Sequence, residues 1–363
     1  MPTRERPAPL VLVATGGADA PFGSYAAVAA TGRQLLAAEL SRRLGALGAP
    51  VVALRPAPPS DEFRWGPWFT AAARAALTAT AADRAVDALG YVGAGALALA
   101  GDDLLDDLLS PVGGEVVANN RFSADAFVIA GDLDAALAAL DDCPTDNAAA
   151  RHLEEAGFTA RDLAARPLSR FDVDTPLDLA LLRLATRLPR QRHPDATVHR
   201  FLEMARLPGG GALEVPHLAE IGEVMRTQRA ELVVAGRIPS AVWAQLERET
   251  ACRVRAIVEE RGMRSARGGT PRSILAAMLR RSSPAELVEE LAGLGDAVIL
   301  DSRVLMAALA GTADGAAWPP DEERFASDFL DPAPVATPWL RELTEAARAS
   351  QVPLLLGSHT LVS

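Results

Sequence analysis

The chain has 363 residues, of which 49% are hydrophobic and 23% are charged, and its formal net charge is −11. This length favours two domains, and the composition excludes a disordered chain, a collagen and a disulfide scaffold. The negative charge argues against a nucleic-acid partner, because non-specific binding of nucleic acid needs a basic surface.

Short aliphatic strands and helical patterns alternate along the first half of the chain. The expected strands are 10–14, 51–54, 115–118 and 126–129, and a third apolar run covers 91–98. The expected helices are 31–47, 102–109, 133–140 and 148–156, and 69–89 forms one alanine-rich helix or a pair of helices. Strands separated by helices predict βαβ units and a mostly parallel sheet. Such sheets bind ligands at the carboxyl ends of their strands, which directs attention to the loops at Gly16, Asn119 and Asp172.

A domain boundary is expected between Arg187 and Gly211, where proline, arginine and glycine are frequent. The chain then consists of a first domain over 1–187, a linker over 188–211 and a second domain over 212–363. In the second domain, strands are expected over 231–235, 253–258, 297–300 and 353–356, and helices over 240–249 (with Ser240 as N-cap), 272–280 and 284–294. The predicted fold class is α/β, with a Rossmann-like, mostly parallel sheet in the first domain and a second α/β domain.

The basic residues and cysteines limit the chemistry that the chain can perform. All 36 basic residues are arginine, which excludes a Schiff base, a pyridoxal site and a Walker A loop, since each requires a lysine amine. A GC-rich genome explains this bias simply, and in either case a functional cation must be an arginine or a metal. Cys143 and Cys252 lie far apart and outside any CxxC motif, so we expect neither a zinc site nor a disulfide framework.

No apolar run is long enough for a signal peptide core or a membrane span, so we expect a cytoplasmic protein without a membrane partner.

The most informative motif is an acidic turn followed by the start of a helix, FDVDTPLDL at 171–179. Thr175 can cap this helix, and Pro176 suits its first position. Asp172 and Asp174 lie one residue apart, and their carboxylates could share a divalent metal or hold magnesium bound to a phosphate. The alternative is that the same residues only form a capped helix entrance.

This motif resembles the carboxyl end of the MobA-like nucleotidyltransferases, a family that includes the molybdenum-cofactor guanylyltransferases and the 2-phospho-L-lactate guanylyltransferases of coenzyme F420 synthesis. The resemblance covers roughly residues 8–187 and includes the region 146–157 before the motif, with Ala150-Arg151-His152-Leu153. It implies a GT-A-like fold. It also implies magnesium-dependent transfer of a nucleoside monophosphate from a nucleoside triphosphate to a small phosphorylated or alcohol acceptor.

Transferred to this sequence, the resemblance implies a set of site residues but no catalytic one. Asp172 and Asp174 would hold Mg²⁺, and backbone N–H groups around Gly16 and Gly17 would hold phosphate, with Arg33 as the first cation after that loop. The other residues expected to contact the nucleotide or substrate are Asn119, Asn120, Asp125 and Thr175. For the segment 119–125 the alternative is a polar turn before a strand, in which asparagine suits the turn geometry.

The sequence differs from the family pattern in one loop and at one single position. The loop over 14–25 contains neither arginine nor lysine, and Ala96 stands where the family carries a metal-binding acidic residue. These differences keep a second hypothesis open, which is a catalytically silent relative. Such a protein would bind a nucleotide or a phosphorylated metabolite, or act as an assembly partner.

Three features outside the motif have structural and functional explanations. Polar groups follow three strands of the second domain, at 236–237, 301–303 and 357–359, and their arginines could hold an anion, although exposed loops explain them more simply. The aromatic segment 63–69 could stack on a nucleobase, but packing over the core is the preferred explanation. The segments 324–331 and 337–340 are expected to form an irregular cover on the second domain, or to bury a contact between two copies in a homodimer.

Overall fold

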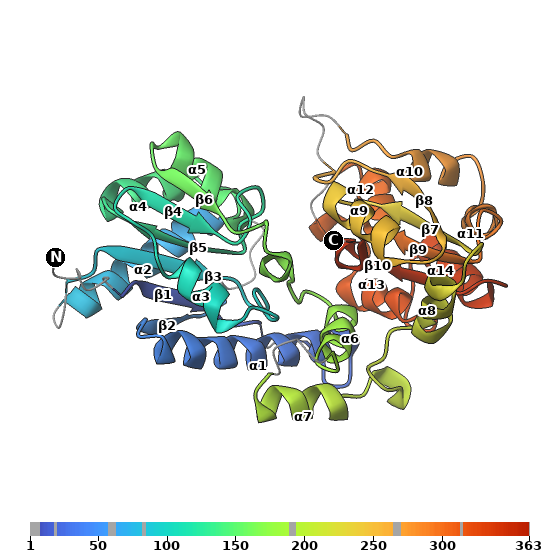
Figure 1. Cartoon of the computed structure of the whole chain (residues 1–363), viewed down its shortest axis with the longest axis horizontal. Helices are drawn as coiled ribbons and strands as arrows, with labels where there is room; N and C mark the ends of the chain where they lie inside the picture. The colour runs from blue at the N-terminus through green and yellow to red at the C-terminus, as the bar shows by residue number, and fades with distance from the viewer. Residues whose placement is uncertain are drawn as a thin grey trace. The chain divides into compact units, whose positions relative to one another are not determined.

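The computed structural model describes residues 8–17, 20–56, 63–81, 85–188, 194–263, 270–312 and 315–362. The chain divides into two compact units, and each contains a β-sheet flanked by helices (Figure 1). The first unit comprises Met1–Phe22, Ala27–Asp174 and Leu182–Ala205, and the second comprises Gly23–Ala26, Thr175–Leu181 and Arg206–Ser363. The predicted α/β fold class is confirmed.

The first unit is built on a six-stranded sheet with the strand order β2-β1-β3-β5-β4-β6. Its strands are β1 (Leu10–Ala14), β2 (Val51–Leu54), β3 (Ala88–Val92), β4 (Glu115–Ala118), β5 (Ala126–Ala130) and β6 (Thr159–Asp162). Strand β5 runs antiparallel to both of its neighbours, β3 and β4, whereas the other pairings within the described part of this sheet are parallel. The residue before β5 therefore lies at the same edge as the carboxyl ends of β3 and β4.

Helices cover both faces of this sheet, and each face has its own hydrophobic core. The helices of this half of the chain are α1 (Tyr25–Ala46), α2 (Trp65–Ala81), α3 (Asp102–Leu108), α4 (Leu133–Asp141), α5 (Ala149–Glu155), α6 (Pro176–Ala185) and α7 (Ala196–Met204). In β1, Leu10 and Leu12 belong to one core and Val11 and Val13 to the other, because successive side chains of a strand point to opposite faces. The near-continuous apolar sequence of β1 is what a strand buried on both faces requires.

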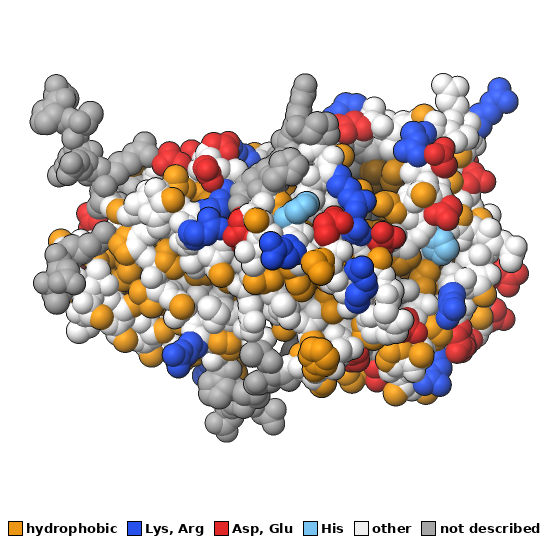
Figure 2. All heavy atoms as spheres, turned by 90° about the horizontal axis from the view of Figure 1, so that it is seen from below, with side chains coloured by type: hydrophobic (Ala, Val, Ile, Leu, Met, Phe, Trp, Pro, Cys, Tyr) orange, Lys and Arg blue, Asp and Glu red, His pale blue; other side chains and the backbone are white. Residues whose placement is uncertain are grey.

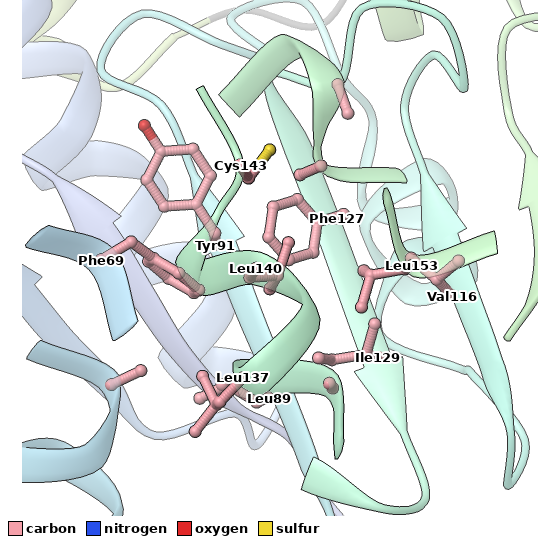
Figure 3. Close-up of a cluster of buried hydrophobic side chains, with 14 of the residues drawn as sticks. Phe69, Leu89, Tyr91, Val116, Phe127, Ile129, Leu137, Leu140, Cys143 and Leu153 are labelled. Atoms are coloured by element: carbon pink, nitrogen blue, oxygen red, sulfur yellow. The ribbon is translucent and has the colours of Figure 1, made fainter. Parts of the chain in front are cut away.

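Aromatic side chains concentrate in one of these cores. Figure 3 shows Phe69 from α2 and Phe127 from β5 beside Tyr91 from β3, with ring centroids 5.4 and 5.7 Å from that of Tyr91. Trp65 stacks on Phe69 at 4.8 Å and is also buried. The preference for core packing over a nucleobase platform is confirmed for Trp65 and Phe69, although a helix rather than a loop carries them.

The predicted helix over 69–89 is wrong at both ends. Helix α2 begins at Trp65 and ends at Ala81, and Ala88 and Leu89 belong to β3. Alanine is frequent across the whole segment, so its composition does not mark where the helix ends. Residues 82–84, which the prediction also included, lie outside the described residues.

The second unit contains a parallel sheet of four strands in the order β10-β9-β7-β8. The strands are β7 (Glu231–Gly236), β8 (Arg253–Val258), β9 (Ala297–Asp301) and β10 (Leu354–Gly357), and the helices are α8 (Leu218–Arg226), α9 (Ser240–Glu249), α10 (Ile274–Leu279), α11 (Pro284–Ala292), α12 (Arg303–Ala310), α13 (Asp321–Asp328) and α14 (Pro338–Ala349). The chain passes from β8 on one side of β7 to β9 on the other side. The carboxyl ends of β7 and β9 therefore meet where the strand order reverses.

Two sequence predictions for the second unit are corrected by the structure. The cover expected to be irregular over 324–331 and 337–340 is mostly helical, in α13 and the first turn of α14. Ser240 is the first residue of α9 rather than its N-cap; Pro239 takes the N-cap position, and its side chain cannot accept a capping hydrogen bond.

Within the part of the chain that the structure describes, none of the helices has the length and apolar character needed to cross a bilayer. In Figure 2, arginine side chains (blue) are interspersed with acidic side chains (red) on the surface of the described residues.

Candidate functional site

At one edge of the first sheet β3 and β4 end and β5 begins, and each of these three strands carries a polar residue in or next to its terminus there. Tyr91 is the last but one residue of β3, Asn119 follows β4 and Asp125 precedes β5. The backbone N–H of Gly93 donates a hydrogen bond of 2.7 Å to the carbonyl oxygen of Asp125, which joins the end of β3 to the start of β5. This is the edge at which α/β sheets bind their ligands.

A buried tyrosine and an aspartate form a pair at this edge. The Tyr91 hydroxyl donates to Oδ2 of Asp146 at 3.0 Å, and the backbone N–H of Asn147 donates to Oδ1 of the same carboxylate at 2.9 Å. Burial raises the pKa of Tyr91 well above its ordinary value, and the charge of Asp146 adds to this effect. The phenol therefore stays protonated and holds the Asp146 carboxylate in place.

Asp125 is the most strongly perturbed carboxyl group of this edge. Burial, together with the charges of Asp146 and Asp174, raises the pKa of Asp125 to about 7, although a hydrogen bond from Asn119 acts to lower it. Burial also raises the pKa of Asp146, with Asp174 contributing and the Tyr91 hydrogen bond opposing. A carboxyl group with a pKa near neutrality can accept or donate a proton under physiological conditions, which an ordinary aspartate cannot do.

The structure separates the roles of the two aspartates in the acidic turn. Asp174 is exposed and acts electrostatically on Asp125 and Asp146. Asp172 instead accepts a hydrogen bond of 2.8 Å from the N–H of Val173 and lies beside Gly95. Gly95 has φ +100°, and a Cβ there would lie 2.3 Å from the carbonyl oxygen of Val173, so this close approach requires glycine.

The predicted Mg²⁺ site is not a preformed cage. Among the described residues, no three His, Cys, Asp or Glu side chains are placed to hold a metal ion together. Carboxylate oxygens nevertheless suit Mg²⁺, and Mg²⁺ in nucleotide sites is usually held by one or two carboxylates together with substrate phosphates and water. The role of Asp172 and Asp174 in holding Mg²⁺ therefore stays a prediction.

The predicted phosphate loop lies against α1. The side-chain amide of Gln34 donates to the carbonyl oxygen of Gly16 at 3.4 Å, and a Cβ on Gly16 would lie 3.1 Å from Cβ of Arg33. Nε of Arg33 is buried without a hydrogen-bond partner among the described residues. The structure thus brings Gly16 and Arg33 together, while Gly17 is exposed to open space; residues 18 and 19 of the same loop are not described.

The two asparagines are engaged with the backbone. Asn119 is 2% exposed; its Nδ2 donates to the carbonyl oxygen of Ser169 at 3.1 Å, and its Oδ1 accepts from the N–H of Ala126 at 3.0 Å. Oδ1 of Asn120 accepts from the N–H of Phe122 at 3.1 Å, which is an Asx turn. These contacts correspond to the polar turn considered for this segment, and a role of either asparagine in nucleotide binding stays a prediction.

Thr175 caps α6, as its sequence position predicts. Its Oγ1 accepts from the N–H of Asp178 at 3.2 Å, and Oδ2 of Asp178 accepts from the N–H of Thr175 at 2.8 Å, which forms a reciprocal cap. Thr175 belongs to the second unit, whereas Asp172 and Asp174 belong to the first. Its role in substrate binding therefore stays a prediction as well.

The polar strand ends of the second unit are neighbours, but their arginines are already paired. Arg237, after β7, binds Asp301 at the end of β9 through two hydrogen bonds, of 2.6 Å from Nε and 3.0 Å from Nη2. Arg303 binds both carboxylate oxygens of Asp328, and Asp301 and Asp328 are fully buried. Because each arginine is neutralised by a buried carboxylate, these strand ends form internal ion pairs rather than an anion site.

Tyr91 and Asp146 were not among the residues selected from the sequence, although Asp146 begins a region that takes part in the MobA-like resemblance. One signal could have identified Tyr91: a rare aromatic residue with a polar tip near the end of an otherwise aliphatic strand. No such signal marks Asp146, because its link to Tyr91 exists only in the folded chain.

No protein-family model matches this chain, and no curated protein matches it. The MobA-like resemblance therefore stays a prediction from the sequence motif.

Proposed function

We propose that the first unit binds a nucleoside triphosphate with Mg²⁺ at this edge and transfers the nucleoside monophosphate to a small phosphorylated or alcohol acceptor. The observation that carries this proposal is the Asp125 carboxyl group, whose pKa is raised to about 7 beside Asp146 and Asp174 at the ligand-binding edge of the sheet. Neighbouring carboxylates repel one another, and a cation relieves this repulsion.

Each residue of the site has a role that follows from its position. The exposed Asp174 would hold Mg²⁺, which neutralises the triphosphate, and Arg33 with the backbone N–H groups around Gly16 would bind phosphate oxygens. Asp125 would take the proton of an acceptor hydroxyl while the acceptor oxygen bonds to the α-phosphorus and pyrophosphate leaves. Tyr91 would keep Asp146 oriented through their hydrogen bond.

A second candidate is a catalytically silent relative that binds a nucleotide or a phosphorylated metabolite. The observation in its favour is that Asn119, expected to contact the substrate, uses both ends of its side-chain amide for backbone hydrogen bonds. The two candidates differ in one measurable outcome, because only the transferase releases pyrophosphate when an acceptor is added.

Thermal unfolding of the full chain with ATP, GTP, CTP or UTP, each with and without Mg²⁺, tests binding first. A ligand present at about a hundred times its Kd stabilises the folded state by about 2.7 kcal/mol. We expect a magnesium-dependent rise in Tm with one nucleotide, and we expect Asp125→Asn to lose most of that rise because it loses the charge that would respond to the cation.

Asp87→Asn is the matched control, because Asp87 is exposed and lies just before β3, at the opposite end of that strand. Equal nucleotide responses in the two variants would show that Asp125 is not part of the site. Stabilisation without pyrophosphate release in the presence of phosphorylated and alcohol acceptors would favour the silent relative.

A further inference from the structure

The second unit contains a solvent-open cavity of about 570 Å³, formed by the segment before α10, by α10 and by helix α12. Its wall includes Thr270, Arg272, Ser273, Ala277 and Arg280, and Ala308 of α12 also lines it. This volume lies in the range of pockets that bind small molecules. The cavity belongs to a different unit from the proposed nucleotide site and has no part in the function proposed above.

The wall of the cavity is fixed to the sheet by buried hydrogen bonds. Oε1 of Glu259, directly after β8, accepts from the Ser273 hydroxyl at 2.8 Å and from the N–H of Leu275 at 3.1 Å. The N–H of Glu259 donates to the carbonyl oxygen of Gly236 at the end of β7, at 2.8 Å. Because Glu259 and Ser273 are both buried, the segment that carries Arg272 is held in one position.

The charges that line the cavity are all positive. Arg272 and Arg280 are both exposed, and among the described residues neither guanidinium group has a hydrogen bond or an ion pair. Among the described lining residues there is no carboxylate. This contrasts with Arg237 and Arg303, which are paired with buried aspartates, and with the net charge of −11 of the whole chain.

We propose that this cavity binds a phosphate-bearing small molecule. A phosphate monoester presents three charged oxygens, one more than a carboxylate, and the planar guanidinium group of arginine binds phosphate oxygens in pairs. Ala277 and Ala308 supply a small apolar surface for the carbon part of the ligand, and the cavity is larger than a free phosphate ion requires. An organic phosphate therefore fits the cavity better than inorganic phosphate or a carboxylate.

Isothermal titration of the full chain tests this proposal, with ribose 5-phosphate, inorganic phosphate and citrate as probes. The titrations contain EDTA, so that magnesium-dependent binding in the first unit does not contribute. We expect ribose 5-phosphate to bind with a stoichiometry of one, more tightly than inorganic phosphate, and citrate to bind most weakly. We expect Arg272→Gln and Arg280→Gln each to weaken ribose 5-phosphate binding by about tenfold or more, since each removes charged hydrogen bonds.

Arg281→Gln provides the matched control. Arg281 is exposed, follows Arg280 in the sequence and does not line the cavity, so its replacement changes the net charge equally and should leave the affinity unchanged. Asp125→Asn should also leave it unchanged, which separates this site from the proposed nucleotide site. Absence of binding by ribose 5-phosphate, an equal loss of affinity in Arg281→Gln, or tighter binding of citrate would each overturn the proposal.

Discussion

Arg303 is a buried charge whose partner determines whether it stabilises the second unit. Its guanidinium donates to both oxygens of Asp328, at 2.7 and 2.6 Å, and also to the Ser302 hydroxyl at 3.1 Å. Removing two charges from water costs several kcal/mol for each ion, and only good geometry with further hydrogen bonds offsets that cost. The ion pair therefore adds little net stability. Replacing only one partner, however, is costly, because the other charge is then buried without a counterion.

We predict that Arg303→Met lowers the free energy of unfolding by about 3–5 kcal/mol, because it leaves Asp328 buried without a counterion. Urea denaturation measures this loss. The double variant Arg303→Met/Asp328→Leu should recover most of it. Arg248→Met is the control, since Arg248 and Glu249 are an exposed pair worth about 1 kcal/mol or less. Equal losses in Arg303→Met and Arg248→Met would contradict the prediction.

Asp125 makes the stability of the first unit depend on pH in an unusual direction. The pKa of Asp125 is raised to about 7 in the folded chain, whereas an unfolded aspartate titrates near pH ~3.9. Between these values the folded state holds a proton that the unfolded state has lost. The contribution of Asp125 to the stability of the folded state is therefore fully present below pH ~4, and it is lost as the pH rises towards 7.

We predict that, as the pH rises from 5 to 8, the free energy of unfolding of Asp125→Asn increases relative to that of the unaltered protein by an amount on the order of 1–3 kcal/mol. The asparagine side chain cannot ionise, so the variant lacks this loss of stability. Urea denaturation at several pH values measures the difference between the two proteins, which cancels the titration of all other groups. Parallel pH profiles would show that Asp125 ionises at its ordinary pKa.

At the scale of the elements, one glycine determines how closely α2 approaches the end of α4. A Cβ on Gly66 would lie only 2.4, 2.5 and 2.8 Å from the carbonyl oxygens of Leu140, Asp141 and Cys143. The N–H of Gly66 donates to the last of these oxygens at 3.1 Å. Three backbone groups surround this position, so no flexible side chain can move aside.

We predict that Gly66→Ala lowers the free energy of unfolding by about 1–3 kcal/mol, because the added methyl group forces the two helices apart. Gly45→Ala in α1 is the matched control: a Cβ there meets nothing within 4 Å, so alanine should stabilise that helix by up to about 1 kcal/mol. Thermal unfolding of both variants measures the two changes. Similar Tm values for the two variants would mean that α2 does not depend on this close approach.

At the scale of the whole molecule, the strands that the sequence predicted best are those with continuous apolar runs, such as β1 and β7. The missed elements lack this signal for identifiable reasons. In α13 the buried positions include Glu323, Ser327 and Asp328, so the core-facing side of the helix is partly polar and shows little hydrophobic periodicity. Strand β6 is an edge strand without buried residues, and its sequence contains no apolar run.

The candidate site was partly predictable for a similar reason. Asp172 and Asp174 lie one residue apart in a recognisable turn, so the sequence could select them, although it could not show that Asp174 raises the pKa of both Asp125 and Asp146. The proximity of Asp125 to Asp146 depends on β5 running antiparallel between β3 and β4, which brings the residue before β5 to the edge where the other two strands end. Strand direction is a tertiary property, and no local pattern encodes it.

The arrangement of the two sheets also has a consequence for how quickly each forms. Strands β4 and β5 pair Ala118 with Phe127, which requires closing only a short loop. Both sheets also contain distant pairings: β1 and β3 pair Leu10 with Leu89 in the first unit, and β7 and β9 pair Leu232 with Ala297 in the second. Long loops must lose their entropy before such distant contacts form, so parallel sheets of this kind fold slowly. Until β9 has paired with both of its neighbours, its free backbone groups and its apolar side chains can associate with other unfolded chains. Dilution or a chaperone should therefore raise the refolding yield of both units.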